Sequence, residues 1–260
     1  GYEFFGGVSK GVEKRTKVKA RIVASALQEL LESHDHVVVM GHRFADMDSL
    51  GAAVGMYRVA RSMGKQACIA IDPKRHLVAP LIARLVENGY GPAFRSPADV
   101  LANLQPNTLL IVVDTHLKNV VESYDLYAAC KTVVVIDHHR KMVNHIDNAV
   151  IFYHEPYASS ASEMVAEMLP YFGEKRRITR VEAEALLAGI MLDTKNFVMR
   201  AGVRTFEAAA YLRRMGADTV EVRKLFSTSM EEYRSRTKII SSTQIYRRCA
   251  IAGVNEPLEH

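Results

Sequence analysis

The sequence predicts an α/β fold built on a doubly wound parallel sheet, and two observations indicate it. Short apolar runs rich in β-branched residues alternate with longer stretches whose apolar positions have helical spacing. The runs at 109–113 and 132–136 are continuously apolar, which is typical of parallel strands covered on both faces. In such sheets ligands bind at the carboxyl ends of the strands, so functional residues are expected there.

The elements can be followed along the chain. A helix is expected over 16–33 because apolar residues recur at helical spacing, and the apolar run at 36–40 predicts the first buried strand. Asp48 or Ser49 can then cap a helix that runs to about residue 63. We expect further strands at 66–71, 109–113, 132–136, 149–153 and 244–252, and further helices at 77–88, 159–169, 181–192, 205–215, 219–226 and 230–242.

Composition excludes several classes of protein. Hydrophobic residues make up 48% and charged residues 24% of the 260 residues, as in ordinary globular proteins and unlike disordered ones. No apolar run approaches the roughly 20 residues that span a bilayer, and no signal peptide is recognisable, so a cytoplasmic chain without membrane contact is expected. Three widely spaced cysteines exclude a disulfide framework. The net charge of +5 suits a phosphate-bearing ligand, and no duplex DNA partner is expected.

Carboxylates and imidazoles follow the predicted strands where each strand ends. A single Asp there is most simply a helix cap, and a single His is most simply a neutral, hydrogen-bonded residue. These interpretations weaken when four segments bring such side chains to one edge of a sheet, because neighbouring carboxylates repel and raise one another's pKa. A divalent cation would relieve that repulsion. The residues are His42, Asp46 and Asp48 after the first strand, Asp114 after the third, Asp137, His138 and His139 after the fourth, and Asp193 at the end of a later helix.

The types of side chain favour particular metals. Several carboxylate oxygens and a few imidazoles, without a thiolate, favour Mn²⁺ or a similar ion such as Mg²⁺, Co²⁺ or Fe²⁺ over structural zinc. There are more ligands than one ion needs, and two ions roughly 3.5–4 Å apart, bridged by one carboxylate, would use them all. Such a pair deprotonates a water and holds a phosphoryl oxygen, and Arg140 could then steady the phosphate.

These motifs together resemble the DHH phosphoesterase superfamily. Any one of them is weak, but their common order and spacing over about residues 37–194 make a specific signal. Further segments are similar to the GdpP-type cyclic-di-AMP phosphodiesterases, whose members are membrane-anchored and carry regulatory domains ahead of the DHH domain. The segments that carry this closer resemblance are 12–16, 40–42, 46–53, 155–160, 204–206 and 216–219.

The resemblance implies roles for individual residues. Two Mn²⁺ ions would be bound, and Asp114 would bridge them. His139, Asp114 and His138 would form the catalytic group. His139 would face the substrate phosphate or steady the bridging water, and Asp137 would orient a histidine. The first ion would be held by His42, Asp46 and Asp114, and the second by Asp48, Asp114, His138 and Asp193.

Other residues are weaker candidates for the substrate site. Ser159 and Ser160 stand at a predicted helix start and could bind phosphate or base, with helix capping as an equal alternative. Arg204 precedes another helix and could meet phosphate, with a surface ion pair as an equal alternative. His116, two residues after Asp114, could support a metal ligand from behind or be a plain loop histidine, and the loop histidine is favoured.

The domain organisation that follows has one incomplete part. No glycine-rich GGGH-like motif of the DHH-associated domain is present, so that domain is expected to be truncated and the far wall of the substrate cleft to be missing. We expect the chain to be the cytosolic part of a membrane-anchored bacterial protein, and to form a homodimer. The expected parts are a linker from an upstream region (1–20), the DHH domain (21–202), linker helices with the first strand of the second domain (203–257) and a vector tag remnant (258–260).

The function implied is hydrolysis of cyclic-di-AMP to linear pApA by metal-activated water. Three alternatives remain open from the sequence. One is an oligoribonuclease or single-strand exonuclease of the same superfamily, acting on short oligonucleotides. Another is a nucleotide-sensing module without turnover, and the third is a pyrophosphatase-like activity.

Overall fold

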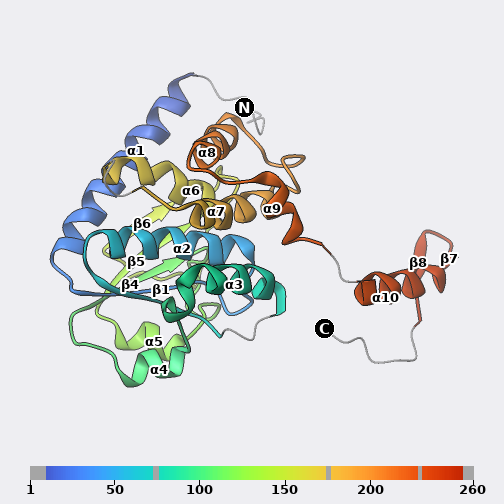
Figure 1. The fold of residues 1–260 in the computed structure, drawn as a ribbon, viewed down its shortest axis with the longest axis horizontal. Helices are drawn as coiled ribbons and strands as arrows, with labels where there is room; N and C mark the ends of the chain where they lie inside the picture. Colours follow the sequence, from blue (N-terminus) through green and yellow to red (C-terminus); the bar gives the residue numbers. More distant parts are fainter. Residues whose placement is uncertain (1–9, 73–75, 174–176, 228–229, 254–260) are drawn as a thin grey trace.

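A parallel sheet of six strands forms the centre of the structure, a computed structural model that describes residues 10–72, 76–173, 177–227 and 230–253 (Figure 1). The strand order is β3-β2-β1-β4-β5-β6, and every neighbouring pair is parallel. The chain moves outward from β1 to β3, then returns to β4 beside β1 and continues to β6. The sheet is therefore doubly wound, as predicted, and its switch point lies between β1 and β4. The strands are β1 His36–Met40, β2 Gln66–Ala70, β3 Phe94–Arg95, β4 Thr108–Val113, β5 Thr132–Asp137 and β6 Ile151–His154.

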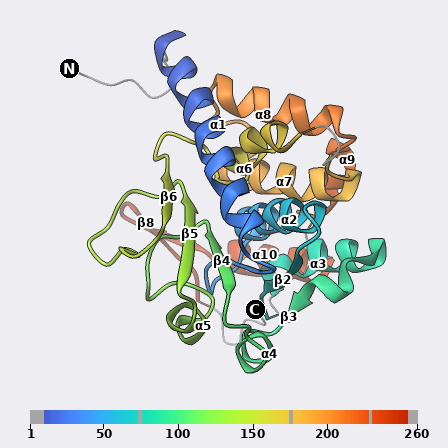
Figure 2. The same cartoon turned by 90° about the vertical axis from the view of Figure 1, so that its left-hand side faces the viewer.

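Helices cover both faces of the sheet because its central strands are apolar on both sides (Figure 2). Alternate residues of one strand enter different cores: Val39 of β1 joins the larger core and Met40 the smaller one. The larger core is covered by α1 Lys10–Glu32, α2 Met47–Ser62, α3 Ala79–Leu85, α6 Ala161–Met168 and α7 Arg180–Asp193, and the smaller one by α4 Pro97–Ala102 and α5 Tyr124–Ala129.

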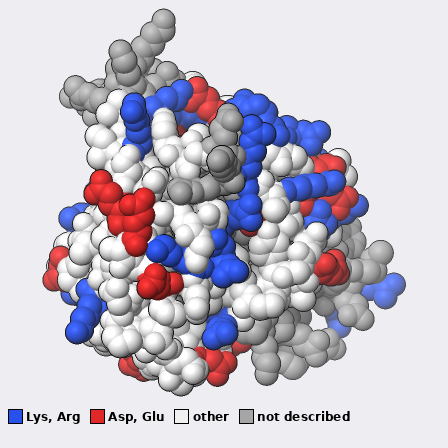
Figure 3. All heavy atoms as spheres, turned by 60° about the vertical axis from the view of Figure 1, so that its left-hand side comes forward, with Lys and Arg blue, Asp and Glu red and all other residues white. Residues whose placement is uncertain are grey.

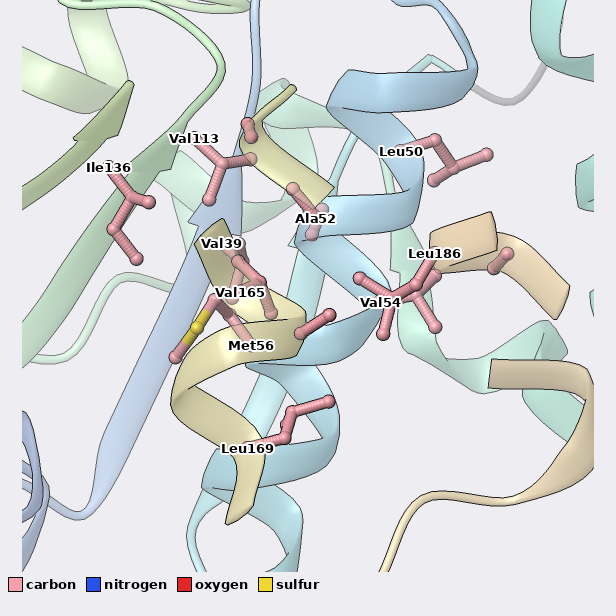
Figure 4. Close-up of a cluster of buried hydrophobic side chains, with 14 of the residues drawn as sticks. Val39, Leu50, Ala52, Val54, Met56, Val113, Ile136, Val165, Leu169 and Leu186 are labelled. Atoms are coloured by element: carbon pink, nitrogen blue, oxygen red, sulfur yellow. The ribbon is translucent and has the colours of Figure 1, made fainter. Parts of the chain in front are cut away.

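The larger core fixes the position of α2 between the sheet and two later helices. In Figure 4 Val39 of the sheet and Val165 of α6 lie near Met56 of α2, while Leu186 of α7 lies near Val54 of the same helix. All of these side chains are buried. Because α2 begins directly after the loop that carries His42, this packing sets the position of that loop.

The C-terminal part adds helices and a hairpin. Helices α8 Val203–Arg214 and α9 Thr219–Lys224 pack on the larger core through buried Leu212 and Val222. Beyond them, α10 Met230–Ser241 leads to a two-stranded antiparallel sheet of β7 Gln244–Tyr246 and β8 Cys249–Ile251. Figure 1 shows α10 and this hairpin away from the six-stranded sheet. The predicted tag remnant at 258–260 and residues 1–9 of the predicted linker lie outside the described residues.

Several details differ from the predictions. Asp46, and not Asp48 or Ser49, is the N-cap of α2, since its side chain accepts hydrogen bonds from the backbone N–H groups of both. The single strand expected at 244–252 is a hairpin. Pro97 occupies the first turn of α4, where its missing N–H costs nothing. The short elements β3, α4 and α5 were not predicted.

Candidate metal centre

The predicted ligands converge at the carboxyl edge of the sheet, at its switch point. Asp114 directly follows β4, and His138 directly follows β5, the next strand in the sheet. The loop after β1 supplies His42, and the last residue of α7 is Asp193. Four segments that are distant in sequence thus deliver side chains to one place.

Two groups of side chains share Asp114. In the first, His42 Nε2 lies 3.2 Å from Asp114 Oδ2 and 3.7 Å from Asp46 Oδ2. In the second, His138 Nε2 lies 3.3 Å from Asp114 Oδ1, 3.2 Å from Asp193 Oδ2 and 3.7 Å from Asp48 Oδ2. The two oxygens of Asp114 therefore face different histidines, as a bridging carboxylate would.

Local structure holds Asp48 in place. Its carboxylate oxygens accept hydrogen bonds from the backbone N–H groups of Ala161 (2.7 Å) and Ser162 (2.8 Å), at the start of α6. Helix α7 passes close behind, because Gly189 has no side chain: a Cβ there would lie 2.8 Å from Asp48 Cα. Asp48 is fully buried, so these contacts set its position closely.

The pKa shifts show that protons partly balance the carboxylates. Burial lowers the pKa of His42 and His138, but the neighbouring carboxylates, Asp114 foremost, outweigh it and raise both to about 10. Burial, followed by repulsion from Asp114, raises the pKa of Asp48 well above its usual range. Burial, together with repulsion from Asp114, raises the pKa of Asp193 to about 6. The centre therefore favours positive charge among its side chains.

The donor atoms suit divalent metal ions. Asp114 Oδ1 and His138 Nε2 are buried polar atoms without a hydrogen-bond partner, and leaving such atoms unpaired is costly. The set consists of carboxylate oxygens and imidazole nitrogens, which are ligands of Mn²⁺, Fe²⁺ and similar ions. In the described part of the chain, the groups close enough to hold an ion include His42–Asp46–Asp114 and Asp48–His138–Asp193. The residues present fit such ions.

A buried network lies behind His139. Asp137 is fully buried, and its Oδ1 lies 2.8 Å from His139 Nδ1, while its Oδ2 accepts a hydrogen bond from His116 Nδ1. The N–H of Met142 donates to His116 Nε2 (3.0 Å), so the proton of neutral His116 lies on Nδ1. His116 is 1% exposed. The sequence favoured an ordinary loop histidine there, and only its position two residues after Asp114 could have signalled this contact.

The remaining predicted substrate residues lie outside these metal-ligand groups. Ser160 caps α6 by accepting a hydrogen bond from the N–H of Glu163 (3.0 Å), and Ser159 donates to the Glu163 carboxylate. Arg204 donates two hydrogen bonds to Glu167, at 2.7 and 2.6 Å, and is largely buried. Arg140 is exposed beside His139. The alternatives of capping and ion pairing thus describe what Ser160 and Arg204 do in this structure.

Basic side chains are unevenly spread over the surface. Figure 3 shows more Lys and Arg in the upper half of one face than in its lower half, with Asp and Glu side chains beside several of them. A positive surface attracts phosphate-bearing molecules over distances of about a Debye length, roughly 8–10 Å.

The fold and the site together define a doubly wound α/β protein with a carboxylate–imidazole centre whose donor atoms suit divalent metals. Residues 36–190 match the model of the DHH family, N-terminal domain, and the chain belongs to this family. The resemblance found in the sequence is thereby confirmed.

Relatives of established name support the closer resemblance too. The chain is 41% identical over 260 residues to the cyclic-di-AMP phosphodiesterase GdpP of Bacillus subtilis, covering 98% of this chain and 39% of that protein. It is 39% identical over 248 residues to the cyclic-di-AMP phosphodiesterase PdeA of Listeria monocytogenes, covering 94% and 37%. The chain thus spans less than half the length of these relatives.

More distant matches agree with the fold. The bifunctional oligoribonuclease and PAP phosphatase NrnA of Thermus thermophilus is 25% identical over 185 residues, covering 71% of this chain and 50% of that protein. An exopolyphosphatase-related protein from Bacteroides fragilis superposes with a TM-score of 0.72 at 18% identity, covering 88% of this chain and 67% of that one. Among the helices described here, none has the length and apolar character needed to cross a bilayer.

Proposed function

We propose that this chain hydrolyses cyclic-di-AMP to linear pApA with two Mn²⁺ ions. One observation carries the proposal: two groups of carboxylates and imidazoles share Asp114, whose two oxygens face His42 and His138. The 41% and 39% identity to named cyclic-di-AMP phosphodiesterases supports the substrate.

The side chains divide into two ligand sets. His42, Asp46 and Asp114 would hold one ion, and Asp114, shared with the second set, would hold both. When bound, such ions polarise a phosphoryl group and lower the pKa of water. The second set consists of Asp48, Asp114, His138 and Asp193.

His139 is the residue best placed to act on the phosphate. Asp137 binds its Nδ1, so the other ring nitrogen, Nε2, is the one left for substrate, and the side chain is 55% exposed. The hydrogen bond to Asp137 raises the pKa of His139, so that Nε2 can carry the proton that a phosphate oxygen or the leaving oxygen needs. Exposed Arg140 follows it and can bind a second phosphate oxygen.

Turnover of cyclic-di-AMP in the presence of Mn²⁺, with the products separated, tests this proposal. We expect pApA to form and chelator to stop the reaction. Two Mn²⁺ bound per chain without cleavage would show that hydrolysis needs the second domain, or that the chain senses nucleotides without turnover. No bound metal and no cleavage would refute the site.

A second candidate substrate is a short linear oligonucleotide. The match to the oligoribonuclease NrnA over 71% of this chain favours it. Supplying pApA and short RNA in parallel reactions separates the two, because an oligoribonuclease consumes pApA whereas the proposed enzyme accumulates it.

The setting of the chain is proposed from its relatives as well. Since it covers 39% of the Bacillus subtilis protein, we propose that it is the cytosolic catalytic part of a longer, membrane-anchored protein. A homodimer is proposed too, and light scattering during size-exclusion chromatography measures it directly.

A further inference from the structure

The loop that follows Asp193 has an unusual backbone. Lys195, Asn196 and Phe197 have φ values of 47°, 58° and 66°, and Arg200 has 55°. In this left-handed region each L-residue other than Gly or Asn costs about 1–2 kcal/mol. Such a conformation persists only where the surroundings impose it, and it is found most often at functional sites.

Buried hydrogen bonds impose this conformation. Fully buried Thr194 donates through Oγ1 to the carbonyl of Ile190 (2.6 Å), and the same Oγ1 accepts from the N–H of Phe197 (2.9 Å). The carbonyl of Thr194 accepts from the N–H of Met199 (2.8 Å). The loop is therefore rigidly built, and it fixes Phe197 four residues after a proposed metal ligand.

The turn places one aromatic ring against another. The rings of Phe197 and Phe206 stack with centroids 5.6 Å apart and planes at 22°. Phe197 packs partly against the core, whereas Phe206 is 56% exposed. Arg204 anchors the first turn of α8 to Glu167, so the position of Phe206 is fixed as well. The pair forms a supported aromatic face that is open to solvent.

The surroundings of this pair combine apolar and basic side chains. Val198 and Val203 are exposed by 82% and 54%. Lys195 and Arg200 are exposed, and neither forms an ion pair with another described residue. Aromatic rings with unpaired cations beside them are how proteins bind single-stranded nucleotides without reading sequence: bases stack and phosphates meet the cations.

We propose that Phe206, supported by Phe197, stacks against a nucleobase of the dinucleotide whose phosphate lies at the metal centre. This inference rests on the proposed function, because it assumes a nucleotide at that centre. Lys195 and Arg200 would face the second phosphate. The left-handed turn serves to aim the aromatic pair.

Fluorescence tests the inference without requiring turnover. The chain has no tryptophan, so Phe206→Trp introduces a single reporter. With Mg²⁺ present, adenosine 5′-monophosphate should quench its emission in a saturable way, while ribose 5-phosphate should not. The matched control is Tyr124→Trp, an exposed aromatic position (57%) on α5, across the sheet, where neither compound should quench. Equal quenching by both compounds, or none with metal bound, would overturn the inference.

Kinetics give an independent readout. Phe206→Ala should raise KM for cyclic-di-AMP about 5- to 100-fold with little change in kcat, and Phe206→Tyr should restore KM. Tyr124→Ala should change neither constant. A wild-type chain without turnover would refute the proposed function, while quenching of Phe206→Trp would still support the base site. Emission typical of a buried indole before nucleotide is added would instead show that another protein segment covers the ring, and would overturn the inference.

Discussion

Asp114 combines an unusual backbone conformation with a central position. Its φ is 59°, a left-handed value that Asp and Asn adopt more readily than other residues with a side chain. The turn lets both carboxylate oxygens face outward from the end of β4, one toward each histidine. Burial alone would raise the pKa of Asp114, but the neighbouring imidazoles of His138 and His42 outweigh it and keep this pKa below its usual range.

The variant Asp114→Asn therefore tests the negative charge of this side chain while keeping its size and backbone conformation. Asn tolerates the same φ, so the fold should be kept, whereas the shared negative charge is lost. We expect hydrolysis to fall about a hundredfold or more, because metal ions contribute several kcal/mol to such reactions. Mn²⁺ bound per chain, measured by equilibrium dialysis, should fall as well. Hydrolysis near the wild-type rate would disprove the bridging role.

Metal binding should release protons. In the metal-free centre the pKa values of His42 and His138 are raised to about 10, so both imidazoles are charged at pH 7. A metal ion binds only the neutral form, so it must displace these protons, and affinity should rise as pH rises from 6 to 8. Calorimetric titration with Mn²⁺ in two buffers of different ionisation enthalpy measures the release. Heat that does not depend on the buffer would contradict it.

At the scale of elements, the centre depends on how closely α7 passes α2. A Cβ on Gly189 would lie 2.7 Å from Asp48 Oδ1 and 2.8 Å from Asp48 Cα. The Ser162 hydroxyl, which lies nearer still, can rotate away, but Asp48 cannot, because it is also bound to the first N–H groups of α6. The absence of a side chain at Gly189 thus allows both the close packing of α7 and the position of Asp48, a proposed metal ligand.

Gly189→Ala should destabilise the protein by about 1–3 kcal/mol, the usual cost of overpacking. The melting temperature should drop by roughly 2–4 °C per kcal/mol, and Mn²⁺ affinity should fall because Asp48 moves. Gly91→Ala is the control, since its Cβ would meet only Val86 Cγ1 at 3.8 Å. Equal melting temperatures for the two variants would show that α7 can shift freely.

Arg204 joins α8 to α6 in a cluster of carboxylates. Besides Glu167, it lies 3.7 Å from Glu155 and from Glu163. Arg204→Leu leaves these carboxylates without their cation and should lower the free energy of unfolding by about 3–5 kcal/mol, measured by thermal unfolding. The double variant Arg204→Leu with Glu167→Leu should lower it less, because one of the unpaired carboxylates is removed as well. Glu207→Ala, which breaks an exposed pair with Lys17, should cost under about 1 kcal/mol. If Arg204→Leu left the stability unchanged and raised KM, Arg204 would instead be a substrate-binding residue.

How far the sequence predicts these elements depends on their length. Strands β1, β4 and β5 are continuous apolar runs and were located within a residue or two. The two-residue β3 and the six-residue α4 and α5 were missed, because periodicity needs a longer window to show. The candidate ligands of the centre could be predicted from the sequence because each follows a strand or ends a helix. The contact between His116 and Asp137 joins two strand ends, and the only signal of it in the sequence is the position of His116 two residues after Asp114.

For the whole molecule, the switch point explains why the site forms where it does. Strands β1 and β4 are neighbours in the sheet, but the chain leaves them in opposite directions, so their end loops diverge and expose the edge. The larger core beneath then holds α2, α6 and α7 around this opening.

Metal should therefore stabilise the molecule as a whole. Its proposed ligands come together only in the folded chain, so Mn²⁺ at a hundred times its dissociation constant should add about 2.7 kcal/mol per site. The melting temperature measured by circular dichroism should rise with Mn²⁺ and return to its original value with chelator. Asp114→Asn should show a smaller rise. An unchanged melting temperature despite bound metal would mean that the ligands also bind in the unfolded chain.

The wide spacing of these residues also affects how the protein folds and unfolds over time. From His42 to Asp193 the ligands span more than half of the chain, and they meet only after three parallel strands and α7 have assembled. Parallel pairing of distant segments is slow, and the last contacts to form are absent from the rate-limiting transition state. Bound metal would then leave the refolding rate unchanged and slow unfolding. The proposed catalytic centre would thereby also slow the loss of the native state.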